Sequence, residues 1–387
     1  MRFPEFSGEW NKYTINDLAT VVGGGTPDTT VKSYWGGDIQ WFTPSEIGKN
    51  KYVDFSKRTI TRDGLDNSSA KLLPLHTILL SSRATVGECS IASNECTTNQ
   101  GFQSLIAKQC NIDFLYYLIQ TKKKDLIRNA CGSTFLEISA NEIRKIKVAV
   151  PVQNEQEQIA KLLSLIDERI ATQNKIIEDL KKLKSAISQL LLFKSDLLEK
   201  RIPLSEVSAL KNGYPFLSSS YDSTGEYEVL TIANVTGERY ICSEGCNRIL
   251  TKPSDIQFHQ TLKANDILIS LTGNVGRVSL CKEGKYLLNQ RVGLLQLNSA
   301  IVREFIYQVL SSRDFEQSMI SCSQGAAQMN IGKGDVENYI IPYSGNPKNL
   351  LKISSALNSF DTKTLTESRI LQLLNRQKSH LLTSLFI

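Results

Sequence analysis

Residues 72–81 read Leu-Leu-Pro-Leu-His-Thr-Ile-Leu-Leu-Ser, and residues 261–270 read Thr-Leu-Lys-Ala-Asn-Asp-Ile-Leu-Ile-Ser. Each segment is followed by a Val-Gly pair, Val86-Gly87 after the first and Val275-Gly276 after the second. Further along, Asn99-Gln100 returns as Asn289-Gln290 at nearly the same offset. A fixed offset between similar strings indicates an internal structural repeat. The chain therefore holds two copies of one globular unit.

Each copy is followed by a proline, Pro151 or Pro342, and then by a long polar stretch of helical character. Residues 154–196 contain no proline or glycine, and at 1.5 Å per residue they predict a helical rod of roughly 65 Å. A heptad repeat marks one face of this stretch and of the C-terminal stretch. Its positions are Ile166, Ile170, Gln173, Ile177, Leu180, Lys184, Ile187 and Leu191, and then Ile353, Leu357, Phe360, Thr364, Glu367, Leu371, Leu374, Lys378, Leu381 and Leu385.

Because each helix alone would expose this largely apolar stripe, we expect the two helices to pack on each other as an antiparallel coiled coil. That pairing relates the two globular copies by an approximate twofold axis. The alternative is two amphipathic helices that lie on their own domains. Both stretches are long, both lack breakers and both occupy the same place in the repeat, which favours the coiled coil.

The copies themselves are predicted to be of mixed, β-rich fold, which gives an α+β fold class overall. Short apolar runs at 78–82 and 145–150 predict strands, and 112–119 with its counterpart 302–310 predict short helices. We expect four regions: a first globular domain at 1–150, a central helix at 151–199, a second globular domain at 200–346, and a C-terminal helix at 347–387 that pairs with the central one.

Composition excludes several classes of protein. The 387 residues carry a net charge of +6 without a polybasic tail, and no stretch approaches the ~18 apolar residues of a membrane helix. The N-terminus lacks an apolar signal core and the eight cysteines form no Cys-x-x-Cys pair, so we expect a cytoplasmic protein without a metal site or disulfide framework. There is no Gly-x-x-x-x-Gly-Lys phosphate loop, and no Asn-Pro-Pro-aromatic string to hold a flipped adenine. No catalytic, cofactor-binding or metal-binding residue is predicted.

Several strings resemble the specificity subunits of type I restriction–modification enzymes. The opening Arg2-Phe3-Pro4-Glu5-Phe6 is similar to the start of many of them. The other similar segments are 23–27, 34–47, 81–87, 98–102 and the helix entry at 149–160. The second copy departs from the pattern: it has Val229-Leu230-Thr231-Ile232-Ala233-Asn234 in place of Trp-Phe-Thr-Pro-Ser, and Gln290-Arg291-Val292 in place of Gln-Gly-Phe.

The resemblance implies a non-catalytic subunit that contains two target-recognition domains and reads a bipartite, gapped DNA sequence. Its expected partners are double-stranded DNA, two adenine methyltransferase subunits and two ATP-dependent translocase–nuclease subunits, with no membrane partner. S-adenosylmethionine, ATP and magnesium are expected on those partner subunits and not on this chain.

Base edges are read in the major groove by Arg, Lys, Asn, Gln, Ser and Thr, so polar residues of the repeated loop-like segments are the DNA-binding candidates. They are Thr26, Thr43, Ser45, Ser82, Arg83, Gln100 and Thr134 in the first copy, and Asn234, Thr272, Asn274, Arg277, Gln290, Arg291, Gln324 and Gln328 in the second. Features shared by both copies, such as Asn99 and Asn289 or the Val-Gly pairs, are better explained as caps and turns. Trp35, Trp41 and Phe42 are expected in the core.

Two alternatives stay open. A two-headed coiled-coil scaffold for protein or glycan ligands would bind DNA only weakly and in a salt-sensitive way. A subunit that serves methylation alone would have no translocase partner.

Overall fold

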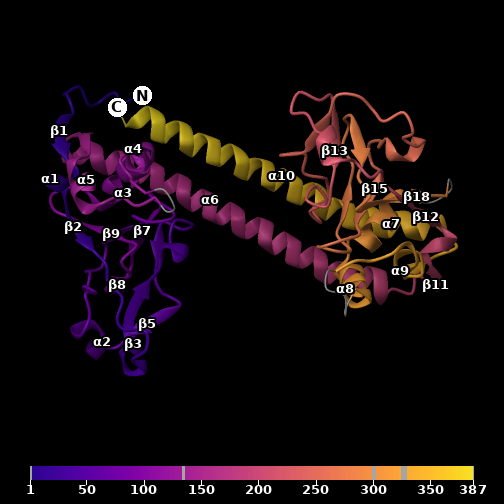
Figure 1. The fold of residues 1–387 in the computed structure, drawn as a ribbon, viewed down its shortest axis with the longest axis horizontal. Coiled ribbons are helices and arrows are strands. Elements are labelled where there is room, and N and C mark those ends of the chain that lie inside the picture. Colours follow the sequence, from indigo (N-terminus) through magenta and orange to yellow (C-terminus); the bar gives the residue numbers. More distant parts are fainter. Residues whose placement is uncertain (1, 133–135, 299–301, 324–328, 387) are drawn as a thin grey trace. The chain divides into compact units, whose positions relative to one another are not determined.

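The computed structural model describes residues 2–132, 136–298, 302–323 and 329–386 (Figure 1). The chain divides into two compact units. Unit 1 comprises Met1–Asn174 and Ile370–Ile387, and unit 2 comprises Lys175–Arg369. Each unit therefore contains one globular domain together with part of each long helix, and the two are treated separately below.

The sheets of unit 1 have the strand orders β1-β10, β2-β9-β6-β7-β4 and β5-β3-β8. Their strands are β1 Asn11–Thr14, β2 Ala19–Gly23, β3 Trp35–Phe42, β4 Tyr52–Val53, β5 Arg58–Ile60, β6 Ile78–Leu80, β7 Cys89–Ala92, β8 Cys96–Thr98, β9 Gln103–Ala107 and β10 Lys147–Val150. The shorter helices are α1 Ile15–Leu18, α2 Arg62–Asp66, α3 Ile112–Thr121, α4 Lys123–Arg128 and α5 Ala140–Lys145. In Figure 1, β3, β5 and α2 lie at the end of the unit that is remote from α3.

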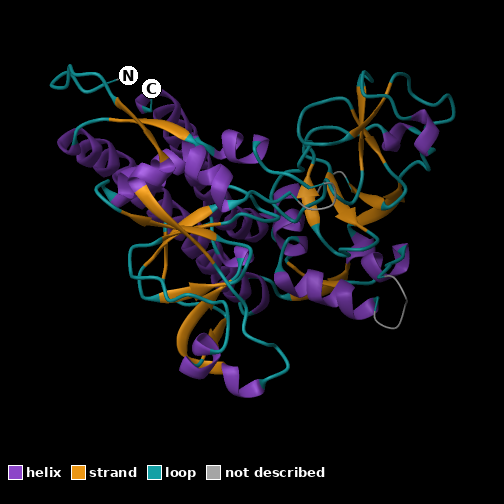
Figure 2. Ribbon diagram, turned by 60° about the vertical axis from the view of Figure 1, so that its left-hand side comes forward, coloured by secondary structure: helices purple, strands orange, loops and turns teal. Residues whose placement is uncertain are grey.

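Unit 2 repeats this topology, with the strand orders β11-β19, β12-β18-β15-β16 and β14-β13-β17. Its strands are β11 Lys200–Pro203, β12 Ser208–Asn212, β13 Tyr227–Leu230, β14 Asn247–Ile249, β15 Ile267–Ser270, β16 Val278–Leu280, β17 Tyr286–Leu288, β18 Val292–Leu297 and β19 Ile340–Tyr343, and its shorter helices are α7 Arg303–Leu310, α8 Arg313–Cys322 and α9 Lys333–Glu337. The pairing modes match as well, because β3 is parallel to β8 as β13 is to β17. The predicted internal repeat and the mixed, β-rich fold are confirmed, and both units show sheets flanked by helices (Figure 2).

The two long helices are α6, Gln153–Ser188, and α10, Pro347–Leu385. In unit 1, Leu163 and Ile166 near the start of α6 share a core cluster with Leu381 and Leu385 near the end of α10. In unit 2, Ile187 near the end of α6 packs on the cluster that holds residues 350, 353 and 357 of α10. The helices therefore pair in antiparallel fashion within each unit.

The predicted heptad stripe is also the buried stripe. Between residues 169 and 186 of α6, the side chains that are not exposed are Ile170, Gln173, Ile177, Leu180 and Lys184. Between residues 362 and 380 of α10 they are Thr364, Glu367, Leu371, Leu374 and Lys378. All ten are positions that the heptad pattern predicts, so the predicted phase agrees with burial over these two stretches.

Some element boundaries differ from the sequence prediction. The strand predicted at 145–150 begins only at Lys147, because α5 continues to Lys145. The helix predicted at 112–119 is α3, and it ends at Thr121 where Lys122 interrupts the path into α4. The α-helical part of α6 stops at Ser188, where a π-turn follows over Gln189–Phe193.

The expected core aromatics lie inside unit 1. Trp41 and Phe42 are buried, and Trp35 is half-buried with the guanidinium of Arg58 stacked 3.5 Å from its ring centroid. The eight cysteines are free thiols. Within the ranges that the structure describes, no helix has the length and apolar character needed to cross a membrane.

Candidate nucleic-acid interface

Four loop segments of unit 1 meet where β6 ends. The Gly101 carbonyl accepts a hydrogen bond from Ser82 N (2.8 Å), and the Gly101 amide donates to Asn99 Oδ1 (2.9 Å). Gly25 N donates to the Thr98 carbonyl (2.8 Å), and Ile138 N donates to the Ser82 carbonyl (2.9 Å). We call residues 24–26, 82–85, 99–101 and 136–138 the first loop edge.

Unit 2 builds the same scaffold from different residues. The Arg291 carbonyl accepts from Leu271 N (3.0 Å), and the Arg291 amide donates to Asn289 Oδ1 (3.1 Å). Tyr214 N donates to the Leu288 carbonyl (2.8 Å), and Ile331 N donates to the Leu271 carbonyl (2.9 Å). Residues 213–215, 271–274, 289–291 and 329–331 form the second loop edge, which repeats these four hydrogen bonds of the first.

The shared residues of the two edges are structural, as the sequence predicted. Asn99 and Asn289 cap their own turns through their side-chain oxygens. Gly87 and Gly276 have φ values of +87° and +77°, a left-handed conformation that glycine adopts without strain. Buried Val86 and Val275 anchor the same turns in the cores. The differences between the edges must therefore lie in the remaining exposed side chains.

Four candidates of unit 1 come together at or beside the first loop edge. Gln100 is exposed, and its Oε1 contacts the hydroxyl of Thr26. Arg83 is exposed and forms an ion pair with Glu137 (2.6 Å). Ser45 is exposed in the turn whose Pro44 ring packs against Gly101. Together they present hydroxyl, amide and guanidinium groups to solvent.

Three further candidates are less accessible: Ser82 and Asn234 are buried, and Thr43 is half-buried. Ser82 is fully buried. Thr43 caps a turn through Glu46, and Thr231 makes the same cap with Asn234, whose Oδ1 lies 2.8 Å from Thr231 N. The sequence comparison missed this equivalence because glutamate and asparagine look unrelated, although both place an acceptor oxygen over the turn.

In unit 2 the candidates Thr272, Asn274, Gln290 and Arg291 lie on the second loop edge, and all but the half-buried Thr272 are exposed. Arg277 does not join them, because it forms an ion pair with Glu316 of α8 (3.7 Å). Three further candidates, Thr134, Gln324 and Gln328, lie outside the described residues.

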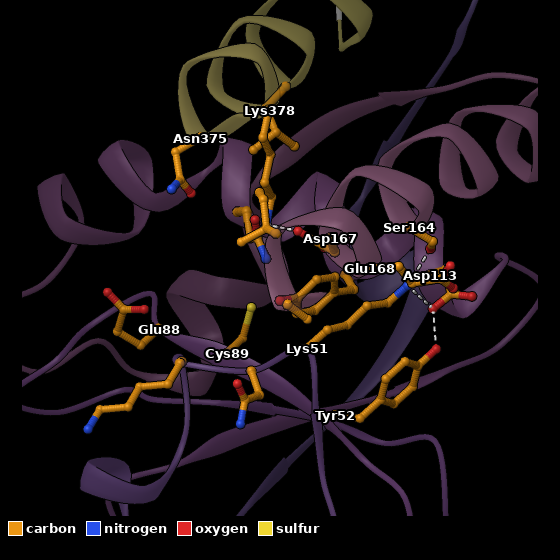
Figure 3. Close-up of a pocket in the computed structure, with 18 of the residues that line it drawn as sticks. Lys51, Tyr52, Glu88, Cys89, Asp113, Ser164, Asp167, Glu168, Asn375 and Lys378 are labelled. Atoms are coloured by element: carbon orange, nitrogen blue, oxygen red, sulfur yellow. Dashed lines mark hydrogen bonds and ion pairs between the residues drawn. The ribbon is translucent and has the colours of Figure 1, made fainter. Parts of the chain in front are cut away.

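Sequence reasoning missed a charged cluster in each unit. In unit 1, Lys51 Nζ lies 2.7 Å from Asp113 Oδ1 of α3 and donates to Ser164 Oγ of α6 (2.6 Å) (Figure 3). The centroid of the Tyr117 ring lies 4.9 Å from the same Nζ. Asp167 of α6 accepts from the Tyr117 hydroxyl (2.7 Å) and pairs with Lys378 of α10 (2.7 Å). We call these residues the unit 1 seat, because they join the globular domain to both long helices.

The unit 2 seat repeats this arrangement. Arg239 pairs with Glu304 of α7 (2.7 Å) and with Asp361 of α10 (3.0 Å), and Lys184 of α6 pairs with the same Asp361 (2.6 Å). Gln308 Nε2 also donates to Asp361 (2.7 Å). Burial alone would lower the pKa of Arg239, but its bonds to Glu304 and the nearby carboxylates raise that pKa.

The seats carry a sequence signal that the repeat search overlooked. Lys51-Tyr52 and Arg239-Tyr240 are both a basic residue followed by tyrosine. Asp167 and Lys184 of α6 are separated by the same number of residues as Asp361 and Lys378 of α10. The repeat therefore relates the Asp167–Lys378 ion pair of unit 1 to the Asp361–Lys184 ion pair of unit 2. The internal repeat therefore extends through the long helices.

A cavity of about 840 Å³ lies beside the unit 1 seat, lined by groups that include Asn50, Glu88 and Asn375 (Figure 3). Its counterpart in unit 2 measures about 250 Å³. In unit 2, Lys181 corresponds to Asn375 and Glu238 corresponds to Asn50, and these two charged residues form an ion pair (2.7 Å).

The chemistry of the cavity does not favour catalysis. Burial and a hydrogen bond to Asp113 raise the pKa of Tyr52 to about 12, and burial raises the pKa of Cys89 to about 12, so both groups stay protonated near neutral pH. Among the residues that the structure describes, no group of His, Cys, Asp and Glu is arranged to hold a metal ion.

Two topologically equal domains, each with an exposed polar loop edge and each seated on paired long helices, define the class of the protein. The chain belongs to the type I restriction modification DNA specificity domain family, whose model matches residues 7–182 and 199–376. The two matched segments correspond to the two structural repeats.

Individual relatives are specificity subunits of type I restriction enzymes. The MjaIX specificity subunit of Methanocaldococcus jannaschii is 39% identical over 183 residues, which cover 45% of this chain and 42% of that protein. The EcoR124I/EcoR124II specificity subunit of Escherichia coli is 28% identical and covers 43% of each chain. The EcoprrI specificity subunit of Escherichia coli is 23% identical over 393 residues, which cover 92% of this chain and 88% of that protein.

Solved structures share the fold over the whole chain. The S subunit of a type I restriction–modification system from M. genitalium aligns with a TM-score of 0.58 at 18% identity, covering 100% of this chain and 99% of that one. A chain from a study of complex assembly and conformational transition of the type I R-M system aligns with a TM-score of 0.60 at 13% identity, covering 98% of both.

Proposed function

We propose that this chain is a non-catalytic specificity subunit that recognises a bipartite, gapped DNA target. One loop edge reads each half-site. The observation that carries the proposal is the pair of loop edges: the same four hydrogen bonds hold both backbones, while their exposed side chains differ. A shared backbone scaffold with different exposed polar side chains is what two domains that recognise different DNA sequences need, because side chains in the major groove distinguish the bases.

The paired helices α6 and α10 supply the spacing in this proposal. Each seat joins a globular domain to both helices through ion pairs of 2.6–3.0 Å. A seat of this kind restricts the rotation of a domain on its helices. Helices of fixed length between two seated readers then set the number of base pairs that separate the half-sites.

The chemistry of the complex belongs to partner subunits in this proposal. Two methyltransferase subunits with S-adenosylmethionine would methylate adenine, and two translocase–nuclease subunits with ATP and magnesium would carry out restriction. The specificity subunits among the relatives support this division of labour. Fold similarity to a chain from a study of type I complex assembly also supports it.

Methylome sequencing tests the proposal. The chain is co-expressed with the methyltransferase subunit of its own host in cells that lack type I systems, and the same cells without the chain serve as the control. We expect one gapped adenine-methylation motif that depends on the chain. Methylation that is absent or ungapped when both proteins are folded and soluble contradicts the proposal, and favours the two-headed scaffold that binds DNA only weakly.

A further inference from the structure

The two loop edges carry different residues at one position of their shared backbone scaffold, Gly101 in the first and Arg291 in the second. Gly101 and Arg291 make the same two hydrogen bonds: the amide donates to an Asn side chain, and the carbonyl accepts from an amide of the loop after β6 or β15. The first edge therefore carries a hydrogen atom where the second carries a guanidinium side chain.

The surroundings of this position also differ in charge. At the first edge, Arg83 is neutralised by Glu137 at 2.6 Å. Their counterparts at the second edge are Thr272 and Asn330, which are uncharged and share a backbone bridge. The second edge therefore lacks both members of the ion pair and carries Arg291 in addition.

Arg291 is exposed, and no carboxylate of the described residues lies within ion-pair distance of it. Its main chain is fixed by the two scaffold bonds. Three other arginines of unit 2, Arg239, Arg248 and Arg277, are each paired with a carboxylate. A guanidinium on a fixed backbone, free of an acidic partner, is prepared for an external acceptor.

The geometry points to Arg291 as the specificity-determining residue of the second loop edge, which reads a guanine in one half-site. This inference rests on the proposed function. Guanine presents O6 and N7 side by side in the major groove, and the planar guanidinium fork binds both at once. The first edge, with Gly101 at this place, has no equivalent reader and must select its bases with other groups such as Gln100.

A phosphate oxygen is the other acceptor that DNA offers to arginine, and the two contacts have different signatures. A base contact discriminates at one position of the site, whereas a phosphate contact strengthens binding to all sequences alike. Lysine replaces arginine well on a phosphate, because a point charge suffices there, but it cannot reproduce the two-pronged contact.

The test uses the full chain in complex with its methyltransferase subunits and duplexes that contain the motif found by methylome sequencing. Each base pair of both half-sites is replaced in turn, and binding is measured for the wild type, Arg291→Ala and Arg291→Lys. Lys282→Ala, an exposed residue of another loop in unit 2, is the control for loss of one positive charge. Gln100→Ala is the control for the other half-site.

We expect the wild type to prefer guanine at one position of one half-site by about 5- to 150-fold, the range of a good bidentate contact. Arg291→Ala and Arg291→Lys should both lose that preference and keep the preferences at every other position, and Lys282→Ala should keep them all. Equal weakening on all duplexes by Arg291→Ala, or unchanged discrimination in either variant, overturns the inference. A wild-type complex without any gapped motif overturns the proposed function instead.

Discussion

Replacing Asp361 by asparagine removes the shared carboxylate of the unit 2 seat with almost no change in shape. Asp361 is 11% exposed and binds Lys184 and Arg239 at once. Arg239 keeps Glu304 at 2.7 Å in the variant, but Lys184, which is 19% exposed, loses its carboxylate partner. The variant therefore leaves one largely buried ammonium uncompensated.

Removing one partner of a buried ion pair costs about 3–5 kcal/mol, and we expect the lower end because the amide oxygen still accepts one hydrogen bond. A loss of about 3 kcal/mol lowers the melting temperature of a unit of this size by about 6–12 °C. Scanning calorimetry of the full chain measures this shift. Lys184→Met combined with Asp361→Asn should recover part of it, because the uncompensated charge is then absent.

The control is Glu178→Gln, which removes the partner of Lys182 at 2.5 Å in an exposed ion pair on α6. Solvent screens such a pair, so this variant should melt with the wild type. If Asp361→Asn destabilises the chain no more than Glu178→Gln does, the seat is not an energetic link between the domain and the helices.

Three further predictions follow from burial and packing. Leu374→Ala should lower the free energy of unfolding by denaturant by about 2–5 kcal/mol, because Leu374 is 7% exposed on the helix seam. Its neighbour Leu373, which is 55% exposed, should tolerate alanine, and equal effects would contradict the phase of the seam. Gly213→Ala should lower the free energy of unfolding by about 1–3 kcal/mol, because the added methyl group meets the backbone of Asn289. Gly8→Ala should leave it unchanged because nothing lies within 4 Å of that position, and an equally neutral Gly213→Ala would contradict the close approach of the two loops. A thiol reagent at pH 8 should label exposed Cys131 and Cys322 quickly. Buried Cys89 should react only after unfolding, because its pKa of about 12 leaves almost no thiolate until the pH approaches that value; rapid labelling of Cys89 would contradict its burial.

The sequence predicted the repeat, the mixed domains and the helix seam because each of these has a periodic signal. Ile170, Ile177 and Leu374 recur at heptad spacing, and this spacing alone determines the face of each helix that is covered. Short strands were recognised where apolar runs stood out, as at β6. Boundaries such as the end of α5 were misplaced, because the apolar run at 145–150 does not show where the preceding helix ends.

The sequence says less about the candidate site, because loop residues of the same type can be either exposed or buried in a turn. Gln290 and Asn234 are both amides in repeated loops, yet one is exposed and the other is buried as the cap of a turn. Only the hydrogen-bond partners separate them. The seats were missed because Lys51 and Arg239 lie far in sequence from Asp113, Glu304 and the long helices that complete them.

The central claim is that paired helices hold two independent readers at a set spacing. Its most direct test is the insertion of one heptad into each helix, between Asp167 and Lys184 in α6 and between Asp361 and Lys378 in α10, which keeps both seats and the phase of the seam. Seven residues add roughly 10 Å, or about three base pairs of DNA. Methylome sequencing of the double insertion should return the same two half-sites with a gap longer by about three base pairs. An unchanged gap, or altered half-site bases, would contradict the claim.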